Sequence, residues 1–245
     1  MSARVGLIVP SSNTVAEVDF YRRLPAGATL HTARMHLVET TPEGESAMLD
    51  DYLPTAISDL ASARPDVVVF GCTSAGALRG NEYEGRLIAQ IAEETGAETI
   101  SVAAAVRRAI MARTSGRVGI ITPYVESLND KIRDSLEADG IEVARVHGLG
   151  ITENFAIAEV EPDRITRFAQ ECFKDGGIDL LFASCTNFRA FDAREDIEQA
   201  LGVPVVTSNH AALEATLDRI ETAGAFRGPA DVRGSLRLRQ GRVVG

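Results

Sequence analysis

Short apolar runs alternate along the chain with amphipathic stretches of helical length. Runs rich in Val, Ile and Leu occupy residues 5–9, 28–37, 66–70, 98–102, 117–121, 140–147, 178–183 and 203–207. Segments with helical spacing lie between them, such as 82–95, 126–138, 162–175 and 190–200. This alternation predicts an α/β fold with a parallel sheet covered by helices on both faces. Because the runs are continuously apolar, we expect strands buried on both sides.

The chain also repeats itself at a fixed spacing. "VGLIVP" begins at Val5, and "VGIITP" begins 113 residues later at Val118. "DVVVFGCTS" contains Cys72, and "DLLFASCTN" contains Cys185, again 113 residues later. An Asp and a Thr in these two segments keep the same spacing. Two landmarks at one spacing predict two lobes of the same topology, facing each other across a cleft.

Composition and charge limit the functions and the cellular locations that we expect for this chain. The chain has 245 residues, 45% of them hydrophobic, which is enough for one large or two small domains with a core. Its net charge of −10 disfavours nucleic-acid binding, because phosphate contacts require clustered Lys and Arg. No run approaches the ~18 apolar residues of a membrane span, and the first residues lack the features of a signal peptide. We therefore expect a cytoplasmic protein with no membrane contact.

The chain has three cysteines, so they cannot all pair, and disulfides are in any case rare in the cytoplasm. There is no C-x-x-C motif, and the four His residues are not spaced with a Cys as zinc ligands usually are. Neither a P-loop nor the glycine fingerprint of dinucleotide-binding folds is present. We expect no metal and no cofactor, which leaves reactive thiols as the interpretation to pursue.

Cys72 and Cys185 each follow a predicted strand, and ligands of open α/β sheets bind beyond the carboxyl ends of strands. Each also precedes a helix-like segment after a short loop, so nearby N–H groups and a helix dipole would favour the thiolate. A lone Cys after a strand is commonly a small buried hydrophobe, and Cys172 on a predicted helix fits that description. Side-chain donors suited to a carboxylate adjoin the paired thiols: Thr73, Ser74, Thr186 and Asn187.

Three further candidates come from other loops at the same edges. Asn13 lies in "PSSNT" after the first strand, Tyr124 in "TPY", and Asn154 in "GITENF". Each has a plain alternative: Asn13 as a helix cap, Tyr124 as a core residue and Asn154 as a turn residue.

Two thiols on opposite sides of a substrate allow two kinds of chemistry. They can take a proton from one face of a carbon and return one to the other face. Alternatively, one thiolate adds to a double bond while the other thiol supplies or removes the proton. Neither route needs a cofactor.

The cysteine pair resembles that of the aspartate/glutamate racemase superfamily. Within it, "GLIVPSSNT" is similar to maleate cis–trans isomerases and to the related arylmalonate decarboxylases. The resemblance runs from about residue 4 to about residue 220 and includes "TPY" and "ENFAIAEVEP". It implies two Rossmann-like lobes, each with a four-stranded parallel sheet, divided as residues 1–112 and 113–208. It also implies that residues 209–245 pack back on the first lobe and that the protein is a homodimer.

The resemblance to the maleate isomerases further implies roles for matching positions. Cys72 would be the nucleophile that adds to the substrate double bond, and Cys185 the partner acid/base. Asn13, Tyr124 and Asn154 would hold the substrate carboxylates. The implied function is the isomerisation of a small dicarboxylate without a cofactor.

Three alternatives remain open. A two-thiol racemase of an acidic amino acid would use the same pair, although "SCTNF" lacks the His that follows the second cysteine loop in many glutamate racemases. Arylmalonate decarboxylases lack the first cysteine, yet "CTSAG" resembles their hydroxyl-rich loop. The third alternative is a non-catalytic protein that binds a carboxylate.

Overall fold

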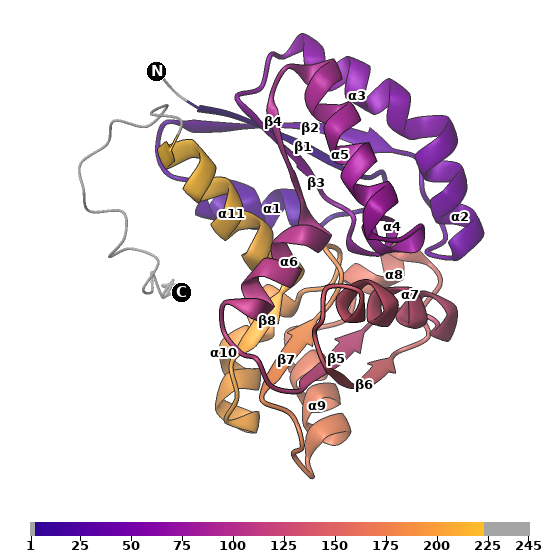
Figure 1. Cartoon of the computed structure of the whole chain (residues 1–245), viewed down its shortest axis with the longest axis vertical. Coiled ribbons are helices and arrows are strands. Elements are labelled where there is room, and N and C mark those ends of the chain that lie inside the picture. Colours follow the sequence, from indigo (N-terminus) through magenta and orange to yellow (C-terminus); the bar gives the residue numbers. More distant parts are fainter. Residues whose placement is uncertain (1–2, 223–245) are drawn as a thin grey trace, which may run out of the picture.

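The computed structural model describes residues 3–222, which form two sheets of the same strand order. The first has the order β2-β1-β3-β4 and the second β6-β5-β7-β8, with every neighbouring pair parallel. The strands are β1 (Ala3–Pro10), β2 (Ala28–Met35), β3 (Val67–Phe70), β4 (Glu98–Ser101), β5 (Val118–Thr122), β6 (Val143–Gly148), β7 (Leu180–Ala183) and β8 (Val205–Thr207). Each overlaps one predicted apolar run. Two four-stranded parallel sheets in two lobes confirm the predicted α/β fold (Figure 1).

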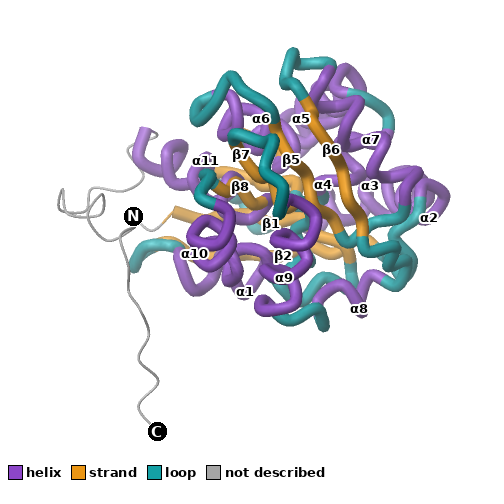
Figure 2. The backbone as a smooth tube through the Cα atoms, turned by 90° about the horizontal axis from the view of Figure 1, so that it is seen from below, coloured by secondary structure: helices purple, strands orange, loops and turns teal. Residues whose placement is uncertain are grey.

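Helices cover the sheets on both faces. In the first lobe, α3 and α5 pack together over one face while α1 and α11 pack over the other. Seen from below, the second sheet lies between α7 on one side and α9 with α10 on the other (Figure 2). The helices are α1 (Ala16–Arg23), α2 (Pro42–Ala47), α3 (Leu53–Ser62), α4 (Thr73–Leu78), α5 (Asn81–Thr95), α6 (Val102–Met111), α7 (Glu126–Glu137), α8 (Asn154–Ala158), α9 (Pro162–Phe173), α10 (Ala190–Leu201) and α11 (Ser208–Thr222), with a π-helical turn, η1 (Met48–Tyr52), between α2 and α3.

Burial differs between the inner strands and two of the edge strands. The inner strands β3, β5 and β7 are buried at every residue, as is β1 apart from Arg4. The edge strands β2 and β6 are exposed or half-buried at most positions. The expectation of burial on both sides is therefore correct for the inner strands and wrong for these two edges, whereas the edge strand β8 is buried throughout.

The repeated Asp has the same structural role in both lobes. Asp66 precedes β3, and its Oδ2 accepts a 2.7 Å hydrogen bond from the backbone N–H of Arg4. Asp179 precedes β7, and its Oδ2 accepts a 2.7 Å bond from the N–H of Arg117. The two bonds join the start of each cysteine-bearing strand to the strand beside it. This part of the repeat therefore serves strand alignment.

The last described helix leaves the second sheet and returns to the first lobe. It packs on α6 and also contacts α1, β3 and β4 (Figure 1). The division of the chain after residues 112 and 208 stays a prediction, and residues 223–245 lie outside the described residues. Within the described part of the chain, no helix is both long and apolar enough to cross a membrane.

A largely buried ion cluster joins helices of the two lobes. Arg107 on α6 donates from Nη2 to Glu84 of α5 at 2.6 Å and from Nε to Asp139, just beyond α7, at 2.7 Å. Its third contact is a 3.0 Å bond to the hydroxyl group of Ser135 on α7. The side chains of Arg107 and Glu84 are only 7% and 2% exposed. Loss of Arg107 would therefore leave the Glu84 carboxylate buried without its cation.

We expect the substitution Arg107→Met to lower the free energy of unfolding by about 3 kcal/mol or more, because it leaves a buried charge unpaired. Urea denaturation measures the change. Arg108→Met is the matched control, since Arg108 is the next residue on α6 and is exposed. Equal stability of the two variants would show that the cluster does not hold the lobes.

Candidate active site

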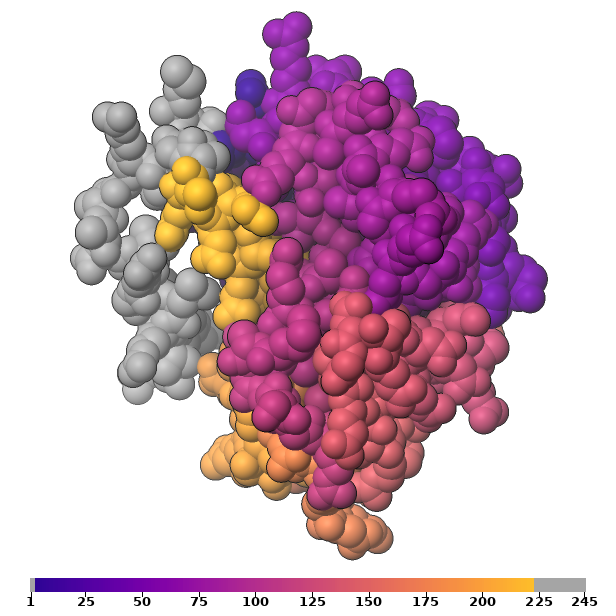
Figure 3. All heavy atoms as spheres, viewed as in Figure 1, coloured from indigo at the N-terminus to yellow at the C-terminus, as the bar shows by residue number. Residues whose placement is uncertain are grey.

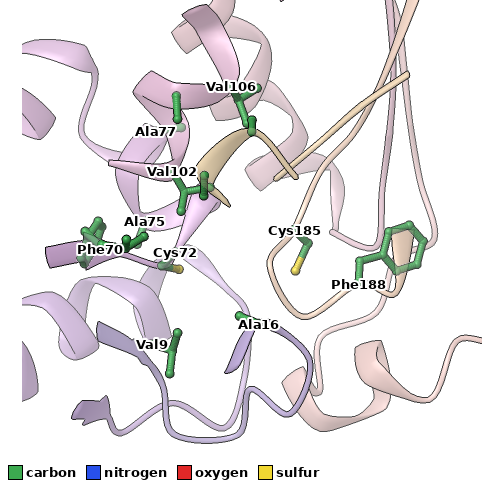
Figure 4. Packing of buried hydrophobic residues seen from close by; sticks show 14 of the residues in the cluster. Val9, Ala16, Phe70, Cys72, Ala75, Ala77, Val102, Val106, Cys185 and Phe188 are labelled. Carbon is green, nitrogen blue, oxygen red and sulfur yellow. The ribbon is translucent and has the colours of Figure 1, made fainter. Parts of the chain in front are cut away.

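The paired cysteines lie at the carboxyl ends of equivalent strands. Cys72 follows β3 after one residue, and its own extended backbone caps α4, which begins at Thr73. The loop expected between this cysteine and its helix is therefore wrong. Cys185 follows β7 in the same way, and there a loop does precede α10. The two sulfur atoms lie on facing loops and point into the space between them (Figure 4).

One small cavity brings all nine predicted site residues together. Its volume is about 10 Å³, roughly the space of one water molecule, and the face drawn in Figure 3 is closed where the lobes meet. The nine residues are Asn13, Cys72, Thr73, Ser74, Tyr124, Asn154, Cys185, Thr186 and Asn187, and each is buried. Pro10, Leu37, Thr40 and Glu45 complete the lining. Cys172 lies on α9, outside this lining. It packs against the core but is only half-buried, so the expectation of a buried residue is met in part.

The two cysteine loops are bonded directly to each other. The Thr186 hydroxyl donates to the carbonyl oxygen of Gly71 at 2.9 Å and accepts a 3.0 Å bond from Nδ2 of Asn13. A Cβ atom at Gly71 would lie 2.8 Å from a methyl carbon of Val9 and 2.9 Å from the carbonyl oxygen of Ile8. Only glycine fits there without a shift of the backbone. The Thr186 hydroxyl is thus used within the protein and holds the loops together.

Ser208, the first residue of α11, forms a second bridge between these loops. Its hydroxyl oxygen accepts a 2.9 Å bond from the Thr73 hydroxyl and a 3.0 Å bond from the backbone N–H of Cys185. The latter bond helps to fix Cys185 at a φ of 101°, a region that residues other than glycine rarely adopt. Ser208 was not among the predicted site residues, although it follows the 203–207 run and the strand-end rule points to it.

Asn13 has the helix-capping role that was its plain alternative, and its role toward a substrate stays a prediction. Its Oδ1 accepts 3.0 Å bonds from the N–H groups of Val15 and Ala16, and so caps the start of α1. Its Nδ2 points the other way, to Thr186 across the lobes.

Asn154 and Asn187 are similarly engaged in the seam between the lobes. Asn154 donates from Nδ2 to Ser12 at 2.7 Å and accepts from Thr40 at 3.1 Å. Asn187 donates from Nδ2 to the carbonyl oxygen of Asn154 at 2.6 Å and accepts from the N–H of Thr14 at 2.9 Å. These side chains order the loops that surround the cavity.

Burial keeps both thiols protonated in the closed site. It raises the pKa of Cys72 well above its ordinary value, and the negative charge of an ionised Glu45 would raise it further. Burial also raises the pKa of Cys185 to about 11, although the nearby Tyr124 hydroxyl and the backbone N–H of Asn187 oppose the shift. Each thiol therefore needs a change in its surroundings to react as a thiolate.

Tyr124 is both a core residue and a cavity residue. Its side chain is 1% exposed, and its hydroxyl group has no hydrogen-bond partner of good geometry among the described residues. Burial, with the nearby charges of ionised Cys185 and Cys72, raises its pKa well above the ordinary value. The phenol therefore keeps its proton and offers it to an acceptor within the cavity.

Glu45 was not among the predicted site residues. It lies on α2, is fully buried, and accepts a short hydrogen bond from the Ser74 hydroxyl. The Ser74 oxygen is in turn 3.9 Å from the Cys72 sulfur. Burial raises the pKa of Glu45 to about 8, and the bond from Ser74 only partly opposes this. Among the described residues, no group of three or more His, Cys, Asp or Glu side chains is arranged to hold a metal ion.

Comparison with known proteins assigns the chain to a family. The sequence profile of the arylmalonate decarboxylase family, whose relatives include maleate isomerases, matches residues 5–232. The chain belongs to this family. A maleate isomerase from Geobacillus stearothermophilus is 27% identical over 218 residues, which cover 84% of this chain and 86% of that protein.

Solved structures of the family share the fold. A maleate isomerase variant from Pseudomonas putida S16, with maleate, has a TM-score of 0.84 and 26% identity over 90% of this chain and 93% of its own. A variant of the Nocardia farcinica maleate cis-trans isomerase, with a covalently bound succinylcysteine intermediate, has a TM-score of 0.82 and 25% identity over 90% of this chain and 94% of its own. The resemblance inferred from the cysteine loops is confirmed at the level of the family and its fold.

We expect alkylation of Cys72 by iodoacetamide to accelerate continuously from about pH 7 to about pH 10, because the thiolate is the reactive form and its pKa is raised. Mass spectrometry of the labelled peptides gives the rate at each pH, with the half-buried Cys172 as an internal comparison. A rate for Cys72 that is already constant above pH 7 would contradict the protonated resting thiol.

Proposed function

We propose that this protein isomerises a small cis-dicarboxylate of the maleate type, with Cys72 as the nucleophile and Cys185 as the partner acid/base. The observation that carries the proposal is the pair of buried thiols that face each other across one cavity. The maleate and the succinylcysteine in the two related structures support it, since they concern the same ligand class and a cysteine adduct.

Once Cys72 has lost its proton, the proposed reaction is balanced by the two thiols alone. The Cys72 thiolate adds to one alkene carbon, and the electron pair of the double bond takes the proton of the Cys185 thiol at the other carbon. The central bond is then single and can rotate. Return of the proton to Cys185 and cleavage of the carbon–sulfur bond release the trans isomer and restore the Cys72 thiolate. No oxidant, reductant or cofactor takes part.

Decarboxylation of a substituted malonate is the second candidate, because the hydroxyl groups of Thr73 and Ser74 stand beside Cys72. Both hydroxyl protons are donated within the protein, to Ser208 and to Glu45. These groups are therefore less suited to gripping a substrate carboxylate than the sequence indicates, and Cys72 has no role in this reaction. Isomerisation accounts for both thiols.

A homodimer and a cytoplasmic location stay predictions.

We expect the protein to convert maleate to fumarate, followed by proton NMR in deuterated water. Cys72→Ser should lower kcat at least about 10³-fold, because the covalent step is lost. Cys172→Ser, a cysteine outside the cavity, is the matched control and should keep full activity.

Other products would support other functions. Deuterium at the α-carbon of aspartate or glutamate, without fumarate, would point to a racemase, and carbon dioxide from phenylmalonate would point to a decarboxylase. Full activity of Cys72→Ser on maleate would contradict the proposed mechanism.

A further inference from the structure

Glu45 reaches the cavity from a helix that belongs to neither cysteine loop. The Thr41 side chain caps the start of α2 through a 3.1 Å bond from the N–H of Gly44, and this helix packs on α4. The next residue, Glu45, is fully buried and lines the cavity beside Cys72 and Ser74.

The two oxygens of the Glu45 carboxyl group differ in their contacts. Oε1 accepts the bond from the Ser74 hydroxyl. Oε2 is buried and has no hydrogen-bond partner among the described residues. Buried polar atoms are rarely left unpaired, because each unpaired group costs about 1–3 kcal/mol. The Tyr124 hydroxyl is unpaired in the same cavity. Two unpaired polar atoms on residues that line one cavity point to a ligand there that accepts or donates hydrogen bonds.

The groups around Glu45 decide whether it carries a charge. The titratable groups that share the cavity are Cys72, Tyr124 and Cys185, all of them acids, and the described lining contains neither Lys nor Arg. Beyond the lining, α2 packs on η1 and α4, whose ion pair between Asp50 and Arg79 is turned to the surface. A buried carboxylate without a cation takes up a proton. The raised pKa of Glu45, about 8, agrees with this.

We propose that Glu45 is a substrate-binding residue that holds a proton and donates it, in a hydrogen bond from Oε2, to a carboxylate oxygen of the substrate. The inference rests on the proposed function only in taking a dicarboxylate as the ligand. Glu45 then acts as a neutral donor alongside the Tyr124 hydroxyl. A cavity with no cation can accept a dianion because its own acids are uncharged. A neutral Glu45 also removes the charge that would oppose ionisation of Cys72.

This role predicts a specific pH dependence of binding. Below about pH 8 Glu45 keeps the proton that it donates, and above that pH it becomes a carboxylate that repels the ligand. The dissociation constant for a dicarboxylate should therefore be level near pH 7 and should rise at least about tenfold by pH 9.5. Calorimetry with maleate and with malonate measures it, in a Cys72→Ser background that stops the proposed reaction.

Variants of Glu45 separate the donor from the charge. Glu45→Gln keeps an N–H donor at the same place, so maleate affinity at pH 7 should stay within about threefold and should no longer fall at high pH through this group. Glu45→Ala removes the donor and should weaken binding about tenfold to a hundredfold. Glu43→Gln is the matched control: it removes one carboxylate from the exposed side of the same helix and should leave both the affinity and its pH profile unchanged.

Several outcomes would overturn the inference. One is an affinity of Glu45→Gln at pH 7 that is tenfold or more below that of its parent, the Cys72→Ser variant. A second is a parent affinity that stays constant or increases as the pH rises. A third is the absence of binding of either dicarboxylate at pH 7. If Glu45→Ala does not fold, Glu45→Gln and the pH profile of its parent still decide the question. If binding depends on pH as expected but the unmodified protein forms no fumarate, only the proposed function is contradicted. Fumarate formation with pH-independent binding would contradict only the role of Glu45.

Discussion

The hydrogen bond from the Thr186 hydroxyl to the carbonyl oxygen of Gly71, 2.9 Å long, joins the two halves of the site. Gly71 directly precedes Cys72, and Thr186 directly follows Cys185, so this one bond limits the separation of the two thiols. The rest of the seam supports it, through Ser208 on one side and Asn13 on the other. The proposed thiol chemistry thus depends on how the lobes are bonded to each other, and each lobe supplies one of the two thiols.

The second constraint is electrostatic. The cavity gathers Cys72, Cys185, Tyr124 and Glu45, and burial is the main reason that the pKa of each is raised. Four neutral acids in a cavity form a set of donors that accept an anionic ligand without any cation. The same burial makes a thiolate costly, and an ionised Glu45 would raise the pKa of Cys72 further. In the proposed function, a proton on Glu45 would therefore favour both the bound dianion and the Cys72 thiolate, in a protein whose net charge is −10.

The sequence predicted the fold and much of the site for a definite physical reason. Parallel strands end at one edge of a sheet, so the cysteines and the donors next to them could be located from the apolar runs and from the 113-residue repeat. Glu45 could not be found in this way, because it lies on a helix that follows an edge strand and reaches the cavity only through packing on α4. The uses of Thr186 and Asn187 were also beyond the sequence, since their partners are distant in the chain.

The most direct test of the account is to identify the sulfur atom that bonds to the substrate. In the proposed reaction, Cys185→Ser keeps a hydroxyl proton that can complete the addition slowly but provides a poor base for its return. Incubation with maleate, followed by acid quench and peptide mass spectrometry, should therefore reveal a succinyl group on Cys72. Cys172 should remain unmodified in the same sample. A succinyl group on Cys172 alone, or no adduct in a folded variant that still forms fumarate, would contradict covalent catalysis by Cys72.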